Sequence, residues 1–98
     1  MSGQIKMTPA ELTQKAGQYG QSAETIREVL GRLESLQREL EEQWQGQAFQ
    51  SFNTQFEDLR PKVTNFAQLM DDIKDQLTKT ADAMEQQDQA LSQNFGFR

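Results

Sequence analysis

Apolar and small side chains recur at alternating intervals of three and four residues along most of this 98-residue chain. This spacing places them on one face of an α-helix. The repeat breaks once, around Gly46, and glycine is the residue best suited to the left-handed backbone that ends a helix. The first series comprises Leu12, Ala16, Tyr19, Ala23, Ile26, Leu30, Leu33, Gln37, Leu40 and Trp44, with Gln37 as its single polar member. The second comprises Phe49, Phe52, Phe56, Leu59, Val63, Phe66, Met70, Ile73, Leu77, Thr80, Met84, Gln87 and Leu91.

A helix start is encoded just before the first series. Thr8 can cap free backbone N–H groups, Pro9 suits the first helical position, and Glu11 completes a capping box. The first helix is therefore predicted to cover about residues 9–43.

A tight turn at residues 44–46 leads into a second helix, predicted to cover about residues 47–93. Pro61 lies within this helix on its outward side, where it should bend the helix rather than end it. Residues 1–98 are thus interpreted as one helical-hairpin domain.

The predicted fold class is all-α. A short connection makes the two helices antiparallel neighbours in a helix-turn-helix hairpin. Val29, Leu36 and Leu69 widen the apolar stripes beyond what two helices can cover, so we expect two hairpins to pair about a two-fold axis as a four-helix bundle. The predicted hairpin and dimer core includes Leu30, Leu33, Phe49, Phe52, Phe56, Phe66 and Ile73.

Composition argues against several functions. The chain has no His and no Cys, which removes imidazole and thiolate ligands and the usual general base near neutral pH. We therefore expect no enzyme activity, no cofactor and no metal. With 10 Lys and Arg against 15 Asp and Glu, the net charge of −5 argues against nucleic-acid binding.

No run of apolar residues is longer than two, which argues against a transmembrane helix or a signal-peptide core. We expect a chain that is synthesised in the cytoplasm, has no cleavable signal peptide and does not insert stably into membranes. The absence of a removable signal indicates a cytoplasmic protein unless export uses a different address.

Trp44 allows two interpretations. It could be an aromatic plug that closes the end of the hairpin, or Trp44 and Gly46 could form part of a recognition surface at the turn. A Trp-x-Gly sequence alone is weak evidence; its place between two helical repeats adds specificity.

The C-terminal segment also allows two interpretations. Met84, Asp88, Leu91 and Phe95 follow one another at intervals of four, three and four residues, so they share a helical face. This segment extends past the predicted first helix. It is either a fraying helix end that keeps its periodicity, or a linear address that a receptor binds as a helix in a groove.

Together, the length, the hairpin, Trp44 with Gly46, and this C-terminal pattern resemble the WXG family of early-secreted-antigen-like (ESAT-like) substrates of type VII, or Ess/Yuk-type, secretion systems. The resemblance spans about residues 8–95. It implies a non-enzymatic helical-hairpin dimer that is exported folded by an FtsK/SpoIIIE-type ATPase to the cell surface or medium. It also implies that Trp44 and Gly46 are the turn motif.

By the same resemblance, Met84, Asp88, Leu91 and Phe95 correspond to the C-terminal export signal. The mycobacterial signal often has Tyr at the position of Met84. The presence of Met there resembles the broader pattern of the homodimeric Gram-positive members. Three alternatives stay open: an adaptor or chaperone for a related small helical protein or a larger toxin, a membrane-active amphipathic protein, and a cytoplasmic coiled-coil scaffold.

Overall fold

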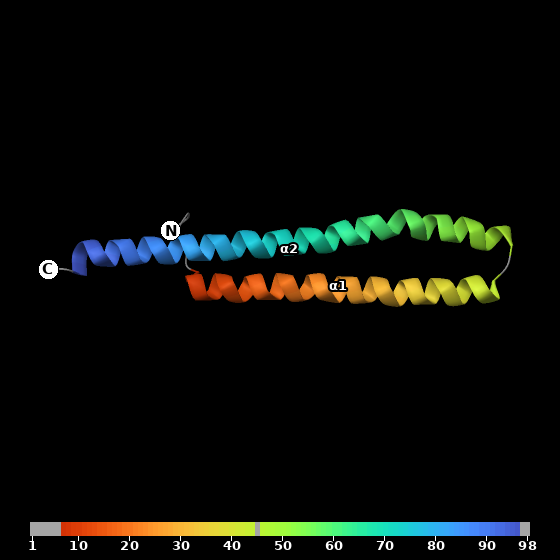
Figure 1. Ribbon diagram of the computed structural model, residues 1–98, viewed down its shortest axis with the longest axis horizontal. Coiled ribbons are helices and arrows are strands. Elements are labelled where there is room, and N and C mark those ends of the chain that lie inside the picture. Colours follow the sequence, from red (N-terminus) through yellow and green to blue (C-terminus); the bar gives the residue numbers. More distant parts are fainter. Residues whose placement is uncertain (1–6, 45, 97–98) are drawn as a thin grey trace.

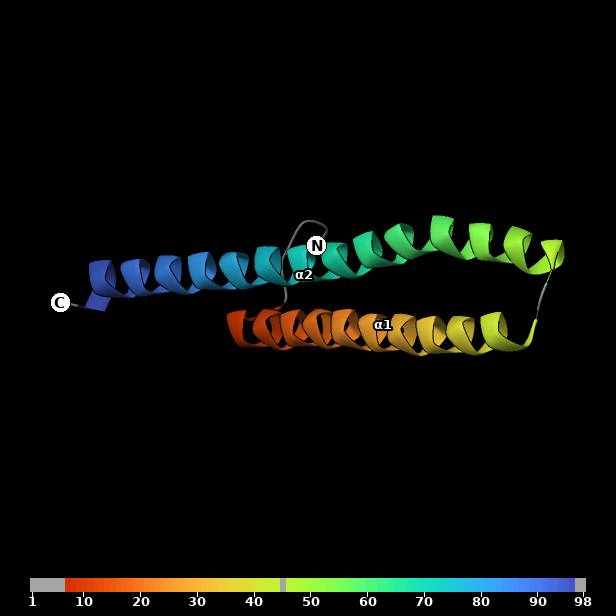
Figure 2. The same cartoon turned by 45° about the vertical axis from the view of Figure 1, so that its right-hand side comes forward.

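The computed structural model consists of two antiparallel α-helices that lie side by side (Figure 1), an arrangement that a second view also shows (Figure 2). Helix α1 spans Pro9–Gln43 and helix α2 spans Gln47–Gly96. The structure describes the backbone of residues 7–44 and 46–96, and side chains as far as residue 88. These residues contain no strand, so the all-α hairpin predicted from the sequence is confirmed.

The start of α1 has the predicted capping box. The Glu11 backbone N–H donates to Thr8 Oγ1 at 3.1 Å, and the Thr8 N–H donates to Glu11 Oε1 at 2.8 Å. Pro9 occupies the first turn, where its missing N–H costs the helix nothing. Each residue of this motif therefore satisfies or removes a free donor of the helix end.

The end of α1 is abrupt. Trp44 is extended, with φ −114° and ψ 105°, although its N–H still donates to the Leu40 carbonyl at 2.7 Å. Gly46 has a φ of +117°, in the region that favours glycine. Its carbonyl accepts from the Gln50 N–H at 3.4 Å, so Gly46 leads directly into α2.

The hairpin is elongated, with extents of 80 × 24 × 17 Å. Its radius of gyration is 22.1 Å, against about 13 Å for a compact domain of this length. Helix α2 has 50 residues and α1 has 35, so α2 extends well past the start of α1 (Figure 1). It ends at Gly96, later than the predicted end near residue 93, because residues 92–95 include neither Gly nor Pro.

Helix α2 changes direction in its green part in Figure 1, the stretch around Pro61. Proline has no N–H to donate to the carbonyl four residues earlier, and its ring crowds that carbonyl. Pro61 is exposed, as its predicted outward position requires. The helix therefore bends there without ending.

The two helices meet along a narrow seam. On α1, the buried side chains recur every seven residues, and they are Ala16, Ala23, Leu30 and Gln37. On α2 they are Phe49, Phe56, Ala67 and Ala81. Ala23 and Ala67 are both 0 % exposed. Such small side chains let two helices approach closely. The buried positions form one narrow strip along each helix.

One flank of the seam is polar. Arg27 Nη2 lies 2.7 Å from Asp71 Oδ2, and Arg60 Nε lies 2.9 Å from Glu34 Oε2. Arg60 also pairs with Glu57 on its own helix, at 2.7 Å. These side chains are partly exposed, and exposed ion pairs contribute little to stability, about 0–1 kcal/mol each.

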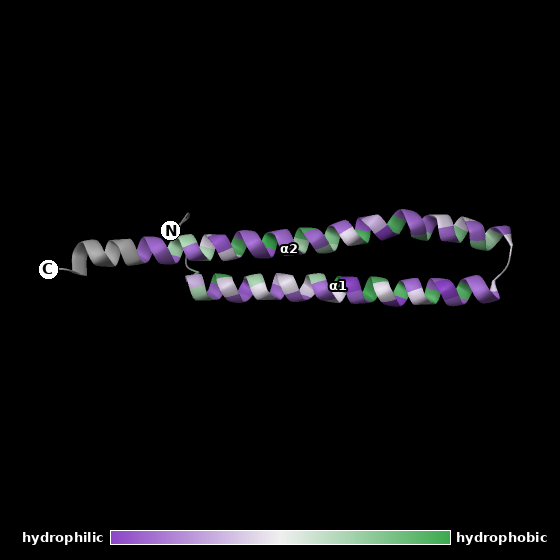
Figure 3. Cartoon of the chain, in the orientation of Figure 1, coloured by the Kyte–Doolittle hydropathy of each residue, from purple (hydrophilic) through white to green (hydrophobic). Residues whose placement is uncertain are grey.

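The opposite flank is apolar and exposed. Leu33 and Glu34 lie on opposite sides of the buried α1 series, so the two flanks are distinct. In Figure 3, hydrophobic bands are interspersed along both helices, whereas the described part of α2 beyond α1 is mainly hydrophilic. We call this flank the apolar face; its exposed members are Val29, Leu33, Leu36, Phe52, Leu59, Phe66 and Leu69.

Substitution of three glycines tests how the backbone conformation at each position affects stability. A Cβ added at Gly17 or Gly31 meets no atom within 4 Å, and both residues are helical. Gly17→Ala and Gly31→Ala are each expected to raise the free energy of unfolding by about 0.5–1 kcal/mol. Gly46→Ala has equal space, yet it should lower the free energy by about 1–2 kcal/mol because of its positive φ. Urea unfolding followed by circular dichroism measures all three, and a stabilising Gly46→Ala would contradict the turn geometry.

Candidate recognition surfaces

An apolar groove lies between the two helices on the apolar face. Its walls come from the C-terminal part of α1 and the N-terminal part of α2. The lining side chains are Leu33, Leu36, Gln37, Leu40, Phe52, Gln55, Phe56 and Leu59. None of these residues carries a charge, so the groove favours contact with another apolar surface over binding an ionic ligand.

The predicted core divides between the seam and this face. Leu30, Phe49 and Phe56 are buried in the hairpin, and Ile73 is half-buried. The other three predicted core residues, Leu33, Phe52 and Phe66, are exposed in the single chain. Phe66 is the most exposed large apolar residue among those whose side chains are described, at 53 %. These three side chains are not enclosed within the hairpin, so a second molecule can contact them.

Trp44 packs at the turn end of the hairpin against the first turns of α2. Its ring centroid lies 5.9 Å from that of Phe49, edge-on, and 5.7 Å from that of Phe52, in a tilted arrangement. The indole nevertheless remains 39 % exposed. Trp44 therefore has the packing contacts of a plug and also an exposed edge that a partner could contact.

The predicted C-terminal face lies on the part of α2 that extends past α1. Ala81 is buried in the seam, Met84 is half-buried and Asp88 is exposed. Leu91 and Phe95 belong to the same helix, but their side chains lie outside the described residues. The described part of this face is accessible to a receptor.

The turn and the C-terminal face are far apart within one chain. Helix α2 begins next to the turn and extends past the start of α1 (Figure 1). Forty-one helical residues separate positions 47 and 88, a distance of about 60 Å along the axis. One hairpin alone therefore does not bring Trp44 and Asp88 together.

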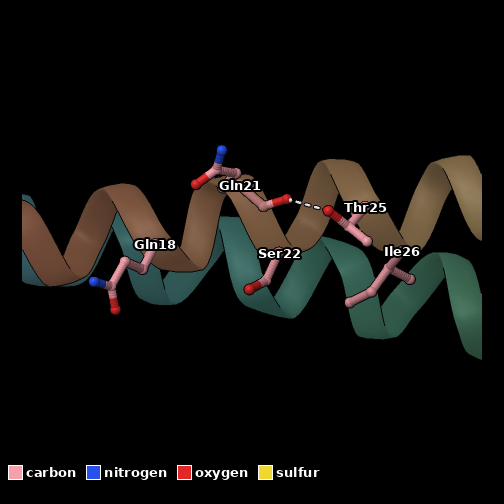
Figure 4. Close-up of a pocket in the computed structure, with 5 residues that line it drawn as sticks. All are labelled: Gln18, Gln21, Ser22, Thr25 and Ile26. Carbon is pink, nitrogen blue, oxygen red and sulfur yellow. Dashed lines mark hydrogen bonds between the residues drawn. The ribbon is translucent and has the colours of Figure 1, made fainter.

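A shallow surface depression on α1 carries only uncharged side chains (Figure 4). It is lined by Gln18, Gln21, Ser22, Thr25 and Ile26, and Thr25 Oγ1 donates to the Gln21 carbonyl at 3.1 Å. Ser22 has no acid or base among these neighbours to activate its hydroxyl. Across the described residues, no cluster of three or more Asp, Glu, His or Cys could hold a metal ion.

Neither described helix has an apolar stretch long enough to cross a membrane.

Residues 4–89 match the profile of WXG100, described as proteins of 100 residues with WXG. The match covers most of the chain, including the turn with Trp44 and Gly46. The chain belongs to the WXG100 family. Curated relatives agree: this WXG100 protein is 50 % identical over 94 residues to "Type VII secretion system extracellular protein A" of Staphylococcus aureus strains USA300 and Newman. The alignment covers 96 % of this chain and 97 % of each relative.

Solved structures support the same assignment. EsxA of Geobacillus thermodenitrificans superposes on this WXG100 protein with a TM-score of 0.84 at 30 % identity, covering 91 % of this chain and 97 % of that one. A mutant of the secreted protein EsxB from Bacillus anthracis superposes with a TM-score of 0.79 at 29 % identity, covering 89 % and 97 %. The hairpin is therefore similar to the folds of EsxA and of the secreted protein EsxB.

Two features of the seam were missed in the sequence pattern. Ala67 and Ala81 are among the most deeply buried residues, although the predicted stripe on α2 passes through Phe66 and Thr80 instead. The pairing of Gln37 with Asn53 was also missed. A signal for the alanines was present, because positions 67 and 81 are two heptads apart and both hold a small residue.

Replacing Trp44 tests its packing role. Trp44→Ala removes two aromatic contacts, each worth about 0.5–1.5 kcal/mol beyond area burial, so the free energy of unfolding should fall by about 1–3 kcal/mol. Trp44→Phe should retain a larger part of that free energy. Urea titrations followed by circular dichroism compare the variants. Equal stability of Trp44→Ala and the parent would mean that the indole does not hold the turn.

Proposed function

We propose that this chain is a non-enzymatic protein secreted by a type VII secretion system. The proposal rests chiefly on 50 % identity, over nearly the full length of both chains, to relatives named as extracellular proteins of that system. The accessible turn and C-terminal face supply surfaces that an export machinery could bind. In this proposal, a structural address on the folded chain directs export, and no cleavable signal peptide takes part.

The exported form is a homodimer in this proposal. Val29, Leu36, Phe66 and Leu69 stay between 37 and 53 % exposed in the hairpin, and apolar side chains gathered on one face favour contact with another molecule. A second copy of the chain offers a matching face. Two hairpins joined through these faces about a two-fold axis form a four-helix bundle.

The two-fold symmetry also addresses the separation of the turn from the C-terminal face. If the hairpins pack antiparallel, the part of α2 beyond Ala81 in one chain lies near the turn of the other. Trp44 and Gly46 of one chain then join Met84, Asp88, Leu91 and Phe95 of its partner in one composite surface. An FtsK/SpoIIIE-type ATPase that binds this surface would select assembled dimers over free monomers.

Two phenylalanines separate hairpin folding from dimerisation. Phe56 is 8 % exposed and belongs to the seam, so Phe56→Ala should cost about 3–5 kcal/mol and disrupt folding. Phe66 lies on the apolar face, so Phe66→Ala should leave the helical circular dichroism intact and weaken the dimer. Sedimentation equilibrium at micromolar concentrations measures this effect. A parent chain that sediments as a folded monomer would refute the homodimer and favour pairing with a different helical protein.

Replacing Asp88 tests whether the C-terminal face is an export signal or only the end of a helix. Its carboxylate is exposed, so Asp88→Ala should change the free energy of unfolding by less than about 0.5 kcal/mol. If a receptor binds this face, the same variant should accumulate in the cell and disappear from the culture medium. Gln86→Ala is the matched control, since this exposed residue lies on the same segment but off the face of Met84 and Asp88.

The export assay compares cell and medium fractions at equal intracellular levels, with a cytoplasmic marker to detect lysis. If Asp88→Ala is exported normally, the C-terminal pattern reflects only the periodicity of the helix and is not an export signal. Loss of export in Gln86→Ala as well would point to a general defect of the segment instead of a specific contact.

A further inference from the structure

One amide lies within the otherwise apolar series that α1 contributes to the seam. Gln37 is 8 % exposed and is the buried polar side chain among the residues whose side chains are described. Its Nε2 donates to Asn53 Oδ1 across the seam, at 3.0 Å. Around it, Leu33, Leu40 and Phe56 line the same groove, so this hydrogen bond forms in apolar surroundings.

Such a pair adds little net stability. A buried neutral hydrogen bond replaces hydrogen bonds to water, and two apolar groups of similar shape often serve as well. Removing one partner is different. Without Asn53, the amide of Gln37 is buried and lacks this hydrogen bond; without Gln37, the half-buried Asn53 loses its partner but keeps some access to water. The pair therefore penalises any arrangement that separates Gln37 from Asn53 much more than it favours the native one.

Near the turn, the apolar side chains by themselves discriminate weakly between registers. On α1 the seam residues are spaced by seven, and the first half of α2 presents Phe49, Phe56 and the half-buried Val63 at the same spacing. A shift of one heptad still brings apolar groups together in this part of the seam, although farther along it would put Arg60 or Lys74 in the place of Ala67. The short turn limits such shifts within one hairpin, but it does not limit the pairing of α1 with α2 of another copy.

A one-heptad shift has a specific cost at the amide pair. Asn53 would then face Leu30 or Trp44 in place of Gln37: Leu30 has no polar group, and Trp44 has a single N–H donor and no acceptor, so neither reproduces the amide of Gln37. The ion pairs on the polar flank, such as Arg27 with Asp71, discriminate less because their side chains are partly exposed and flexible.

We propose that the Gln37–Asn53 pair is a specificity determinant: it selects the native register of α1 against α2 and excludes misaligned pairing between copies of the chain. One buried polar residue in a helical interface is known to set register in this way. The proposal concerns helix pairing alone and does not depend on the proposed role in secretion.

The first test compares single and double replacements. Asn53→Leu should lower the equilibrium constant for folding about tenfold or more, since it leaves the buried amide of Gln37 without its partner, and Gln37→Leu should lower it less because Asn53 is half-buried. The double variant Gln37→Leu with Asn53→Leu should recover most or all of that loss. Additive losses in the double variant would show that the two amides are not coupled, and would overturn the proposal.

The second test measures register. The chain has no Cys, so Gly20→Cys with Lys74→Cys introduces one specific disulfide; a Cβ at Gly20 lies 2.9 Å from the Lys74 Cδ. Oxidation should give a disulfide within each chain when the amide pair is present. A one-heptad shift moves the helices by about 10 Å, too far for this bond.

With both amides replaced by Leu, we expect a lower yield of the disulfide within chains, covalent dimers on non-reducing gels, and mixed oligomers in light scattering. Gln21→Leu with Asn65→Leu makes the same exchange at two exposed positions and should behave like the parent. An unchanged disulfide yield and one oligomeric species in the seam variant would overturn the proposal. The proposal would also be overturned if the control variant showed the same loss of disulfide yield and the same mixed oligomers. The added apolar surface of the leucines would then explain both results.

Discussion

The close approach of α1 and α2 along an alanine-rich seam is the constraint on which the other features of this molecule depend. Ala23 and Ala67 are fully buried, and their small side chains let the helices pack closely. A close, narrow contact covers only one strip of each helix. On one flank of that strip, the side chains make polar contacts. On the other, side chains such as Leu36 and Phe66 remain exposed to solvent.

The difference in helix length separates the surfaces that we assign to recognition. With 35 residues in α1 and 50 in α2, one end of the hairpin holds the turn and the other holds an unpaired helical segment. Trp44, at the end of α1, and Asp88, in the C-terminal part of α2, are therefore far apart within one hairpin. In our proposal, an antiparallel dimer covers the exposed apolar face. The same dimer brings the turn of one hairpin next to the C-terminal segment of the other.

Much of the fold followed from short-range chemistry in the sequence. Thr8 and Glu11 make the capping box that their spacing predicts, and Gly46 has the positive φ expected of a glycine between two helices. Pro61 lies inside α2 without ending it. Spacing and the family resemblance together pointed to the candidate recognition residues, and Trp44 and Asp88 are exposed in the structure. Each of these features depends on neighbours within a few positions in the chain.

The sequence by itself therefore determined the two helices, the turn between them and the C-terminal extension of α2. Only the tertiary structure decided which side of each apolar stripe faces the other helix. The stripes are wider than the seam, and a spacing of three and four residues does not show that Phe56 is inside while Phe66 is outside. The partnership of Gln37 with Asn53 also required the fold, because their contact depends on how two distant segments align in space.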